Sequence, residues 1–176
     1  VFVWIHGGMN TLGAADMSLY HGANLAAKGK MIVVSMNFRL GLLGWLRHKY
    51  LREGDHLDDS GNYGLLDIIK SLQWVRENIL NFGGDPDNVT IAGESAGGFN
   101  VISLLASPLA KGLFHRALSQ SSAASLISST KIQGQIVAHN LLVKMIIKDG
   151  LAKNRVEADF LILFKGKKWV RNYLRS

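Results

Sequence analysis

The chain has 176 residues, of which 48% are hydrophobic, and it carries a formal net charge of +7 with no cysteine. This apolar content excludes a disordered protein, and the lack of cysteine excludes disulfides and thiolate metal sites. No apolar run approaches the roughly 20 residues needed to cross a bilayer, so the composition predicts a globular domain without a membrane span.

Four short segments are predicted strands, three of them by their β-branched residues and the last by its position. They are Val1–Ile5, Met31–Met36, Asn88–Gly93 and Arg116–Ser119. Helical patterns separate them, the clearest of which covers Tyr63–Asn81. Alternating strands and helices predict an α/β fold with a mostly parallel sheet and flanking helices.

The first predicted strand already begins at Val1, and the chain does not start with Met. We therefore expect the true N-terminus to lie upstream, together with any targeting segment. A chain without cysteine suits the cytoplasm and a secreted bacterial protein equally well, so the localisation stays open.

Residues 131–176 hold ten Lys or Arg against three Asp or Glu, whereas residues 1–130 hold ten of each. Two amphipathic segments in this tail predict surface helices. Their apolar residues are Ile132, Ile136, Val137, Leu141 and Met145 in the first, and Val156, Phe160, Leu163 and Phe164 in the second. A basic surface can recruit nucleic acid or anionic lipid. Because the basic residues alternate with apolar ones at helical spacing, we interpret the tail as a solvated helix face and expect no nucleic-acid partner, with a module for an acidic partner as the alternative.

No repeat, low-complexity tract or linker interrupts the chain. We therefore treat residues 1–176 as a single incomplete domain, with a core over residues 1–125 and a basic helical segment over residues 126–176.

Residues 93–97, Gly-Glu-Ser-Ala-Gly, match the G-x-S-x-G pattern of a nucleophile elbow. Such an elbow holds the serine on a strained turn, and it needs small residues two positions away on either side so that the backbones can approach. The motif lies between a predicted strand and a predicted helix over Phe99–Leu105, which is the context it requires. Ser95 is therefore the candidate nucleophile, and the free N–H groups at the helix start favour an oxyanion.

Residues 6–9, His-Gly-Gly-Met, follow the first predicted strand and are similar to the H-G-G-G loop that donates N–H groups to an oxyanion. A Gly-Gly pair after a strand is often only a tight turn, but its combination with the elbow favours the functional interpretation. The oxyanion hole would combine the Ala96 N–H with donors from this loop. We expect His6 to orient the loop rather than to carry protons.

Several longer motifs follow one another in order between Val1 and about Ser121. They are residues 3–8 (Val-Trp-Ile-His-Gly-Gly), 37–41 (Asn-Phe-Arg-Leu-Gly), 62–67 (Asn-Tyr-Gly-Leu-Leu-Asp), 82–86 (Phe-Gly-Gly-Asp-Pro), 89–98 (Val-Thr-Ile-Ala-Gly-Glu-Ser-Ala-Gly-Gly) and 113–117 (Leu-Phe-His-Arg-Ala). In these motifs the chain resembles the type-B carboxylesterases, the family of cholinesterases and bacterial para-nitrobenzyl esterases. The resemblance implies an α/β-hydrolase fold and serine-dependent hydrolysis of a small-molecule carboxylic ester through an acyl-enzyme, without a cofactor.

The resemblance also implies roles for individual residues. It makes Ser95 the nucleophile, and the oxyanion hole would consist of the backbone N–H groups of Gly8, Met9 and Ala96. Met9 stands where the family usually has a third glycine, which puts the substrate range in doubt.

Other residues are placed around this centre by the same resemblance. Glu94 and Ser121 would lie in a second layer near the catalytic histidine, and Arg39 would form a structural ion pair with Asp67. Ser122 stands where the family usually has glycine, a departure to which we attach little weight.

The rest of a catalytic triad is not apparent in the sequence. In this fold the order along the chain is serine, then acid, then histidine, but no Asp or Glu lies between Ser95 and the last histidine, His139. We therefore expect both partners in a missing C-terminal portion of the same protein. A serine without a base is a poor nucleophile, so residues 1–176 alone should be inactive.

The sequence also bears on metal and nucleotide sites and on a non-catalytic function. The acidic cluster Asp55, Asp58 and Asp59 lacks the spacing of a calcium loop, and no phosphate-binding glycine motif is present, so we expect neither a metal nor a nucleotide cofactor. The alternative function is a non-catalytic, cholinesterase-like binding or adhesion homologue, against which the retained Ser95 argues.

Overall fold

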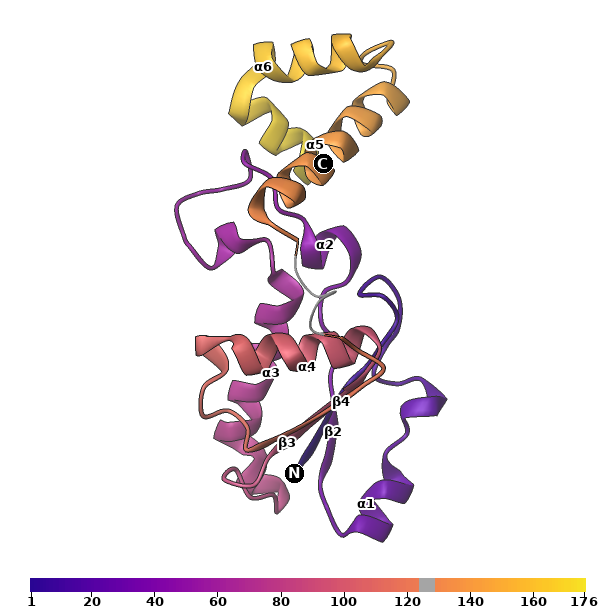
Figure 1. Cartoon of the computed structure of the whole chain (residues 1–176), viewed down its shortest axis with the longest axis vertical. Coiled ribbons are helices and arrows are strands. Elements are labelled where there is room, and N and C mark those ends of the chain that lie inside the picture. The colour runs from indigo at the N-terminus through magenta and orange to yellow at the C-terminus, as the bar shows by residue number, and fades with distance from the viewer. Residues whose placement is uncertain (124–128) are drawn as a thin grey trace. The chain divides into compact units, whose positions relative to one another are not determined.

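A computed structural model describes residues 1–123 and 129–176 (Figure 1). The chain forms two compact units, one made of Val1–Trp45 and Tyr63–Ser128, the other of Leu46–Asn62 and Ser129–Ser176. The domain division expected at residues 125 and 126 lies outside the described residues.

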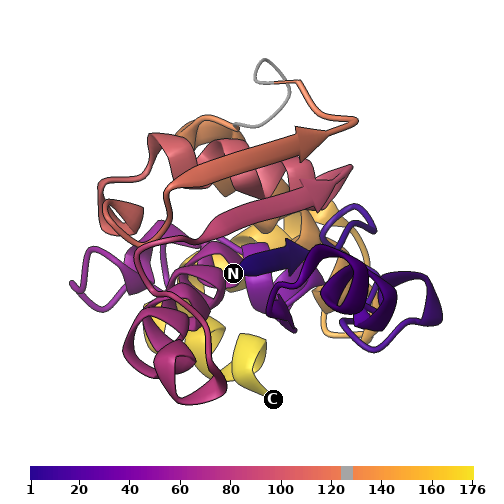
Figure 2. The ribbon, with the colours of Figure 1, turned by 90° about the horizontal axis from the view of Figure 1, so that it is seen from below.

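The first unit contains a four-stranded sheet in the order β2-β1-β3-β4. The strands are β1 (Phe2–Ile5), β2 (Val33–Ser35), β3 (Thr90–Glu94) and β4 (Arg116–Gln120), and all neighbouring pairs are parallel. Figure 2 shows β1, β3 and β4 side by side. The predicted parallel sheet is thus confirmed. Its register, with Ile5 opposite Gly93 and Glu94 opposite Gln120, brings the carboxyl ends of β1, β3 and β4 together.

Among the described residues of this unit there are four α-helices. They are α1 (Ala23–Gly29), α2 (Gly41–Trp45), α3 (Tyr63–Asn78) and α4 (Ala96–Ala106). The long predicted helix is confirmed as α3, which continues as a 3₁₀ turn over Ile79–Phe82. The sequence analysis gave no bounds for the short helices α1 and α2, because elements of this length show too little apolar periodicity. Further 3₁₀ turns lie at Ser18–Tyr20 and Pro108–Ala110.

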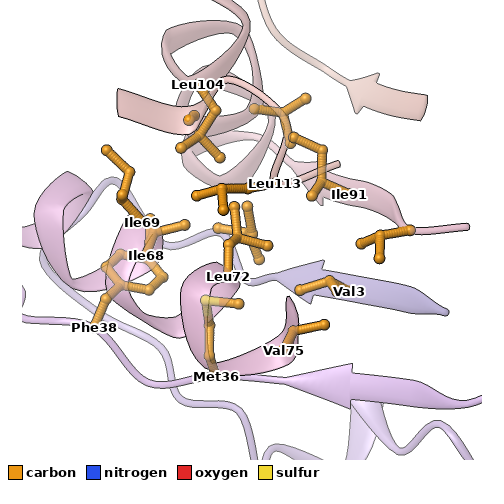
Figure 3. Packing of buried hydrophobic residues seen from close by; sticks show 14 of the residues in the cluster. Val3, Met36, Phe38, Ile68, Ile69, Leu72, Val75, Ile91, Leu104 and Leu113 are labelled. Atoms are coloured by element: carbon orange, nitrogen blue, oxygen red, sulfur yellow. The ribbon is translucent and has the colours of Figure 1, made fainter. Parts of the chain in front are cut away.

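The core of the first unit lies between the sheet and the helices α3 and α4 (Figure 3). Val3 and Ile91 of the sheet pack with Leu72 of α3 and Leu104 of α4, and each of these side chains is at most 1% exposed. Full burial of such a side chain contributes roughly 1.5–3 kcal/mol. This packing holds β3 and α4 in place, and Ser95 lies between these two elements.

The second unit consists of residues 46–62, with a 3₁₀ turn at Asp58–Ser60, and the helices α5 (Lys131–Lys148) and α6 (Arg155–Arg175). Both predicted helices of the tail are confirmed. Helix α6 is kinked at Gly166, whose φ of 70° and ψ of −173° are not helical. None of the helices in the described residues has the length and apolar character needed to cross a membrane.

Candidate functional site

Ser95 occupies a sharp turn between the end of β3 at Glu94 and the start of α4 at Ala96. Its φ of 54° and ψ of −121° are strained for a residue with a side chain. Two backbone hydrogen bonds hold this conformation: the Ser95 N–H donates to the Gln120 carbonyl at 3.0 Å, and the Ser95 carbonyl accepts from the Phe99 N–H at 3.0 Å. The serine is therefore fixed to β4 on one side and to α4 on the other.

Two glycines of the motif make this turn sterically feasible. A Cβ added at Gly93 would lie 2.5 Å from the carbonyl oxygen of Gly97. One added at Gly97 would lie well under 3.0 Å from the carbonyl oxygen of Ile5 in β1. Because real Cβ atoms do not approach so closely, both positions require glycine, as the motif predicts.

The loop that follows β1 lies directly against this turn. A Cβ on Gly7 would lie 3.3 Å from the Cβ of Ser95 and 2.8 Å from the carbonyl oxygen of Glu94. The loop turns back at Gly8, whose carbonyl accepts the N–H groups of Thr11 at 3.0 Å and Leu12 at 2.9 Å. The structure thus brings together the two segments that the sequence pointed to separately.

The candidate oxyanion donors lie on both of these segments. Gly8 and Met9 lie in the loop with φ of 108° and 58°, and Ala96 opens α4. Within residues 1–123 and 129–176, none of their N–H groups donates to another residue. Met9 is 79% exposed.

His6 is buried beneath the loop, with only 1% of its surface exposed. Its ring stacks on Phe38 at a centroid distance of 4.5 Å, and its Nδ1 lies 2.8 Å from the Gly7 carbonyl oxygen, to which an N–H there donates. A Cβ on Gly13 would lie 2.5 Å from the same Nδ1, so the end of the loop closes over the ring. A role for His6 in orienting the loop stays a prediction.

The two residues expected around the centre differ in their setting. The Glu94 Oε2 atom would lie 3.1 Å from a Cβ on Gly7, so this carboxylate adjoins the loop. Ser121 follows β4 with φ of 54°, and it is exposed. Beside it, the Ser119 hydroxyl donates to the Gly98 carbonyl at 2.9 Å and hydrogen-bonds the Ser122 hydroxyl, which ties β4 to α4.

Sequence reasoning missed one contact at this site. The amide Nδ2 of Asn100, on α4, donates to Oδ1 of Asn10, in the loop, at 3.0 Å. The available signal was a polar residue between Phe99 and Val101 on an otherwise apolar helix, but its partner is 90 positions away in the sequence.

A general base is not found next to the serine in the part of the chain that the structure describes. No histidine or carboxylate there hydrogen-bonds the Ser95 hydroxyl. His139 belongs to the second unit, where its Nε2 pairs with Oδ1 of Asp159 at 2.7 Å. The described residues also contain no cluster of His, Cys, Asp or Glu that could hold a metal ion.

Comparisons with known proteins show the family and the fold of the chain. The model of the carboxylesterase family matches residues 1–157. The para-nitrobenzyl esterase of Bacillus subtilis is 49% identical over 150 residues, covering 85% of this chain and 29% of that protein. The liver carboxylesterase of Sus scrofa is 47% identical over 143 residues, covering 81% of this chain and 24% of its own length. The solved structure of a thermophilic PNB esterase superimposes with a TM-score of 0.72 at 41% identity, over 99% of this chain and 35% of that one.

Proposed function

Because the chain belongs to the carboxylesterase family, we propose that it carries the nucleophile and the oxyanion hole of a serine-dependent carboxylic-ester hydrolase. The family and the α/β-hydrolase fold expected from the sequence are both confirmed by the comparisons. The observation that carries the proposal is the close approach of the loop at Gly7 to Ser95 on its strained turn.

The reaction begins with attack by Ser95 Oγ on the ester carbonyl carbon. The hydroxyl proton passes to a general base, and the carbonyl oxygen becomes negatively charged. Donors for this oxygen are the unpaired N–H groups of Gly8, Met9 and Ala96. Removal of one such donor typically lowers the rate by on the order of 10²–10³.

Collapse of the tetrahedral intermediate completes the first half of the reaction. The bond to the alcohol oxygen breaks, the alcohol leaves with a proton, and the acyl group remains on Ser95. Water then attacks the acyl-enzyme, and the serine is regenerated as the carboxylic acid departs. The protein needs no cofactor for either step.

The substrates we propose are small or medium uncharged carboxylic esters. The relatives in the comparison are a para-nitrobenzyl esterase and a liver carboxylesterase, which supports this class. Met9 adds a side chain at the edge of the proposed hole, so it is the position at which we expect the acyl or alcohol preference to differ from relatives with glycine.

Residues 1–176 by themselves should turn over esters negligibly. None of the described histidines is paired with the Ser95 hydroxyl, and the hydroxyl of an unassisted serine stays protonated near neutral pH.

The test is labelling by a fluorophosphonate probe, followed by hydrolysis of para-nitrophenyl acetate. Both are measured on residues 1–176 and on the full product of the reading frame. We expect the full product to label and turn over, Ser95→Ala to abolish both, and residues 1–176 to remain inactive. Ser103→Ala is the matched control, because this serine also lies on α4 but donates to the Phe99 carbonyl within its own helix.

The opposite result is equally informative. If the folded, full product neither labels nor turns over, the catalytic proposal is wrong. The non-catalytic binding homologue is then the better account, because the elbow would be retained for structural reasons only.

A further inference from the structure

We propose that the hydrogen bond between Asn100 and Asn10 fixes the oxyanion loop, residues 6–13, on the helix that follows Ser95. In this account Asn100 is a positioning residue for ester hydrolysis. Its catalytic consequence rests on the proposed function, whereas its effect on the loop does not.

The first support is the burial of Asn100. Asn100 is 2% exposed and lies on α4 near the core residues Val101 and Leu104, which are at most 1% exposed. An amide buried without a hydrogen bond carries an energetic penalty, because it loses its bonds to water without a replacement. The bond from its Nδ2 to Asn10 Oδ1, at 3.0 Å, removes that penalty only while the loop stays in place. The buried amide therefore favours one position of the loop.

The second support is the way in which the loop is held at Asn10. Its φ of 57° lies in the left-handed region, which asparagine tolerates better than most residues. Its carbonyl accepts the N–H of Gly41 at 2.7 Å. The residue is thus anchored by its side chain to α4 and by its backbone to the start of α2, and it directly follows Met9, a proposed oxyanion donor.

The third support is the position of the Asn10–Asn100 hydrogen bond close to the proposed oxyanion hole. The hole combines donors from two segments, the loop and the first residue of α4, so its shape depends on how one segment sits on the other. Asn100 lies one helical turn after Ala96, on the same face of α4. A displacement of about 1 Å at an active site can lower a rate by about 10²-fold. The hydrogen bond between Asn10 and Asn100 is therefore placed to control the distance between the loop donors, Gly8 and Met9, and the Ala96 N–H.

The first experiment measures amide hydrogen exchange of Thr11, Leu12 and Gly41 in residues 1–176, because these N–H groups donate to the Gly8 and Asn10 carbonyls of the loop. The variants are Asn100→Ala and Asn10→Gly, the latter because glycine accepts the positive φ while removing the amide. We expect exchange to become at least about tenfold faster in both variants, since each removes the contact that opposes local opening. Ser103→Ala and the exchange of α5 serve as controls and should not change.

The second experiment measures hydrolysis of para-nitrophenyl acetate by the full product of the reading frame. We expect kcat to fall by about 10–100-fold in Asn100→Ala and Asn10→Gly, with KM within about twofold, because only the transition state carries the oxyanion. The double variant should be no worse than either single variant, since both remove one contact. Asn10→Asp keeps an acceptor oxygen for the Asn100 Nδ2 and should retain the slow amide exchange of the loop.

Three outcomes would overturn the proposal. One is unchanged exchange at Thr11, Leu12 and Gly41 in both variants. Another is a kcat that stays within twofold of the wild type, and the third is an equal loss of kcat in Ser103→Ala, which would indicate general damage to α4. If the wild-type protein has no esterase activity, the proposed function fails, but the exchange measurement still decides whether the bridge holds the loop.

Discussion

Gly97 lies on the first turn of α4, where the helix backbone meets the carbonyl oxygen of Ile5 in β1. A methyl group at this position would force the helix away from the sheet. We expect Gly97→Ala to lower the free energy of unfolding of the first unit by about 3 kcal/mol, at the upper end of overpacking penalties. It should also reduce labelling at Ser95, because the turn would move.

The matched control is Gly134→Ala on α5. A Cβ there would have its nearest neighbour at 3.9 Å, so it fits without a shift. Alanine should stabilise that helix by up to about 1 kcal/mol. Urea denaturation compares both variants with the wild type, and equal stability of Gly97→Ala and Gly134→Ala would contradict the steric argument.

At the scale of single residues, the sequence predicted contacts between residues that are close together in the chain. The elbow at Ser95 and its two glycines could be predicted, because their geometry depends on neighbouring residues. The Asn10 to Asn100 contact could not, because nothing local indicates which buried amide will meet which loop.

At the scale of elements, Arg39 joins the segment after β2 to α3. Its Nε and Nη2 donate to the two carboxylate oxygens of Asp67, each at 2.8 Å, and its backbone N–H donates to Oδ2 at 2.9 Å. This is the ion pair that the family resemblance implied, and the structure confirms it. Burial raises the pKa of Asp67, but the hydrogen bonds and charge of Arg39 outweigh this effect and hold the pKa below its usual value.

We expect Asp67→Asn to lower the free energy of unfolding by about 1 kcal/mol at pH 7, a modest value because Arg39 is half-exposed. A lowered pKa means that the stabilisation is present above the unfolded pKa and is lost as pH falls through the folded one. The difference between variant and wild type should therefore narrow below about pH 4. Urea unfolding at pH 7 and below about pH 4 tests this, and Asp87→Asn, at an exposed position, is the control. A difference in unfolding free energy between Asp67→Asn and the wild type that does not change with pH would contradict the prediction.

The apolar pattern predicted the helices α5 and α6 but not which of their sides are buried. Both were predicted, but the apolar residues that marked them are largely exposed, including Ile132 at 70% and Phe160 at 69%. The buried sides carry another set, which comprises Ala138, Leu142, Val143, Ile146, Ala158, Ile162 and Val170. Both helices carry apolar residues on more than one side, and small residues such as Ala158 allow close packing. Periodicity alone could not choose the side.

At the scale of the whole molecule, each of the two units has its own apolar cluster. In the second unit, His48 is only 3% exposed, and its Nδ1 accepts the N–H of Tyr50 at 3.2 Å. Burial lowers the pKa of His48 to about 4, and the nearby charges of His139 and Lys49 act in the same direction. The unfolded chain thus binds a proton more readily than the folded one.

The second unit should therefore be fully stabilised above the unfolded pKa of His48, near 6.5, and lose stability as pH falls toward 4. The loss should be on the order of 2–3 kcal/mol. Amide exchange of α5 measured across this range reports it. His48→Asn, which keeps an acceptor but does not titrate, should flatten the dependence, whereas the exposed His56→Asn should not; equal pH profiles for His48→Asn and the wild type would contradict the assignment.

The sequence by itself determined the alternation of strands and helices, the elbow at Ser95 and the glycine loop after the first strand, because each depends on the spacing of a few neighbouring residues. Only the tertiary structure decided the strand order, the grouping of residues 46–62 with residues 129–176, the buried sides of α5 and α6, and the bond between Asn10 and Asn100. The physical reason is common to all four. They depend on contacts between groups far apart in the chain. Packing and the cost of burying an unpaired polar atom select these contacts, and a local sequence pattern contains no information on either.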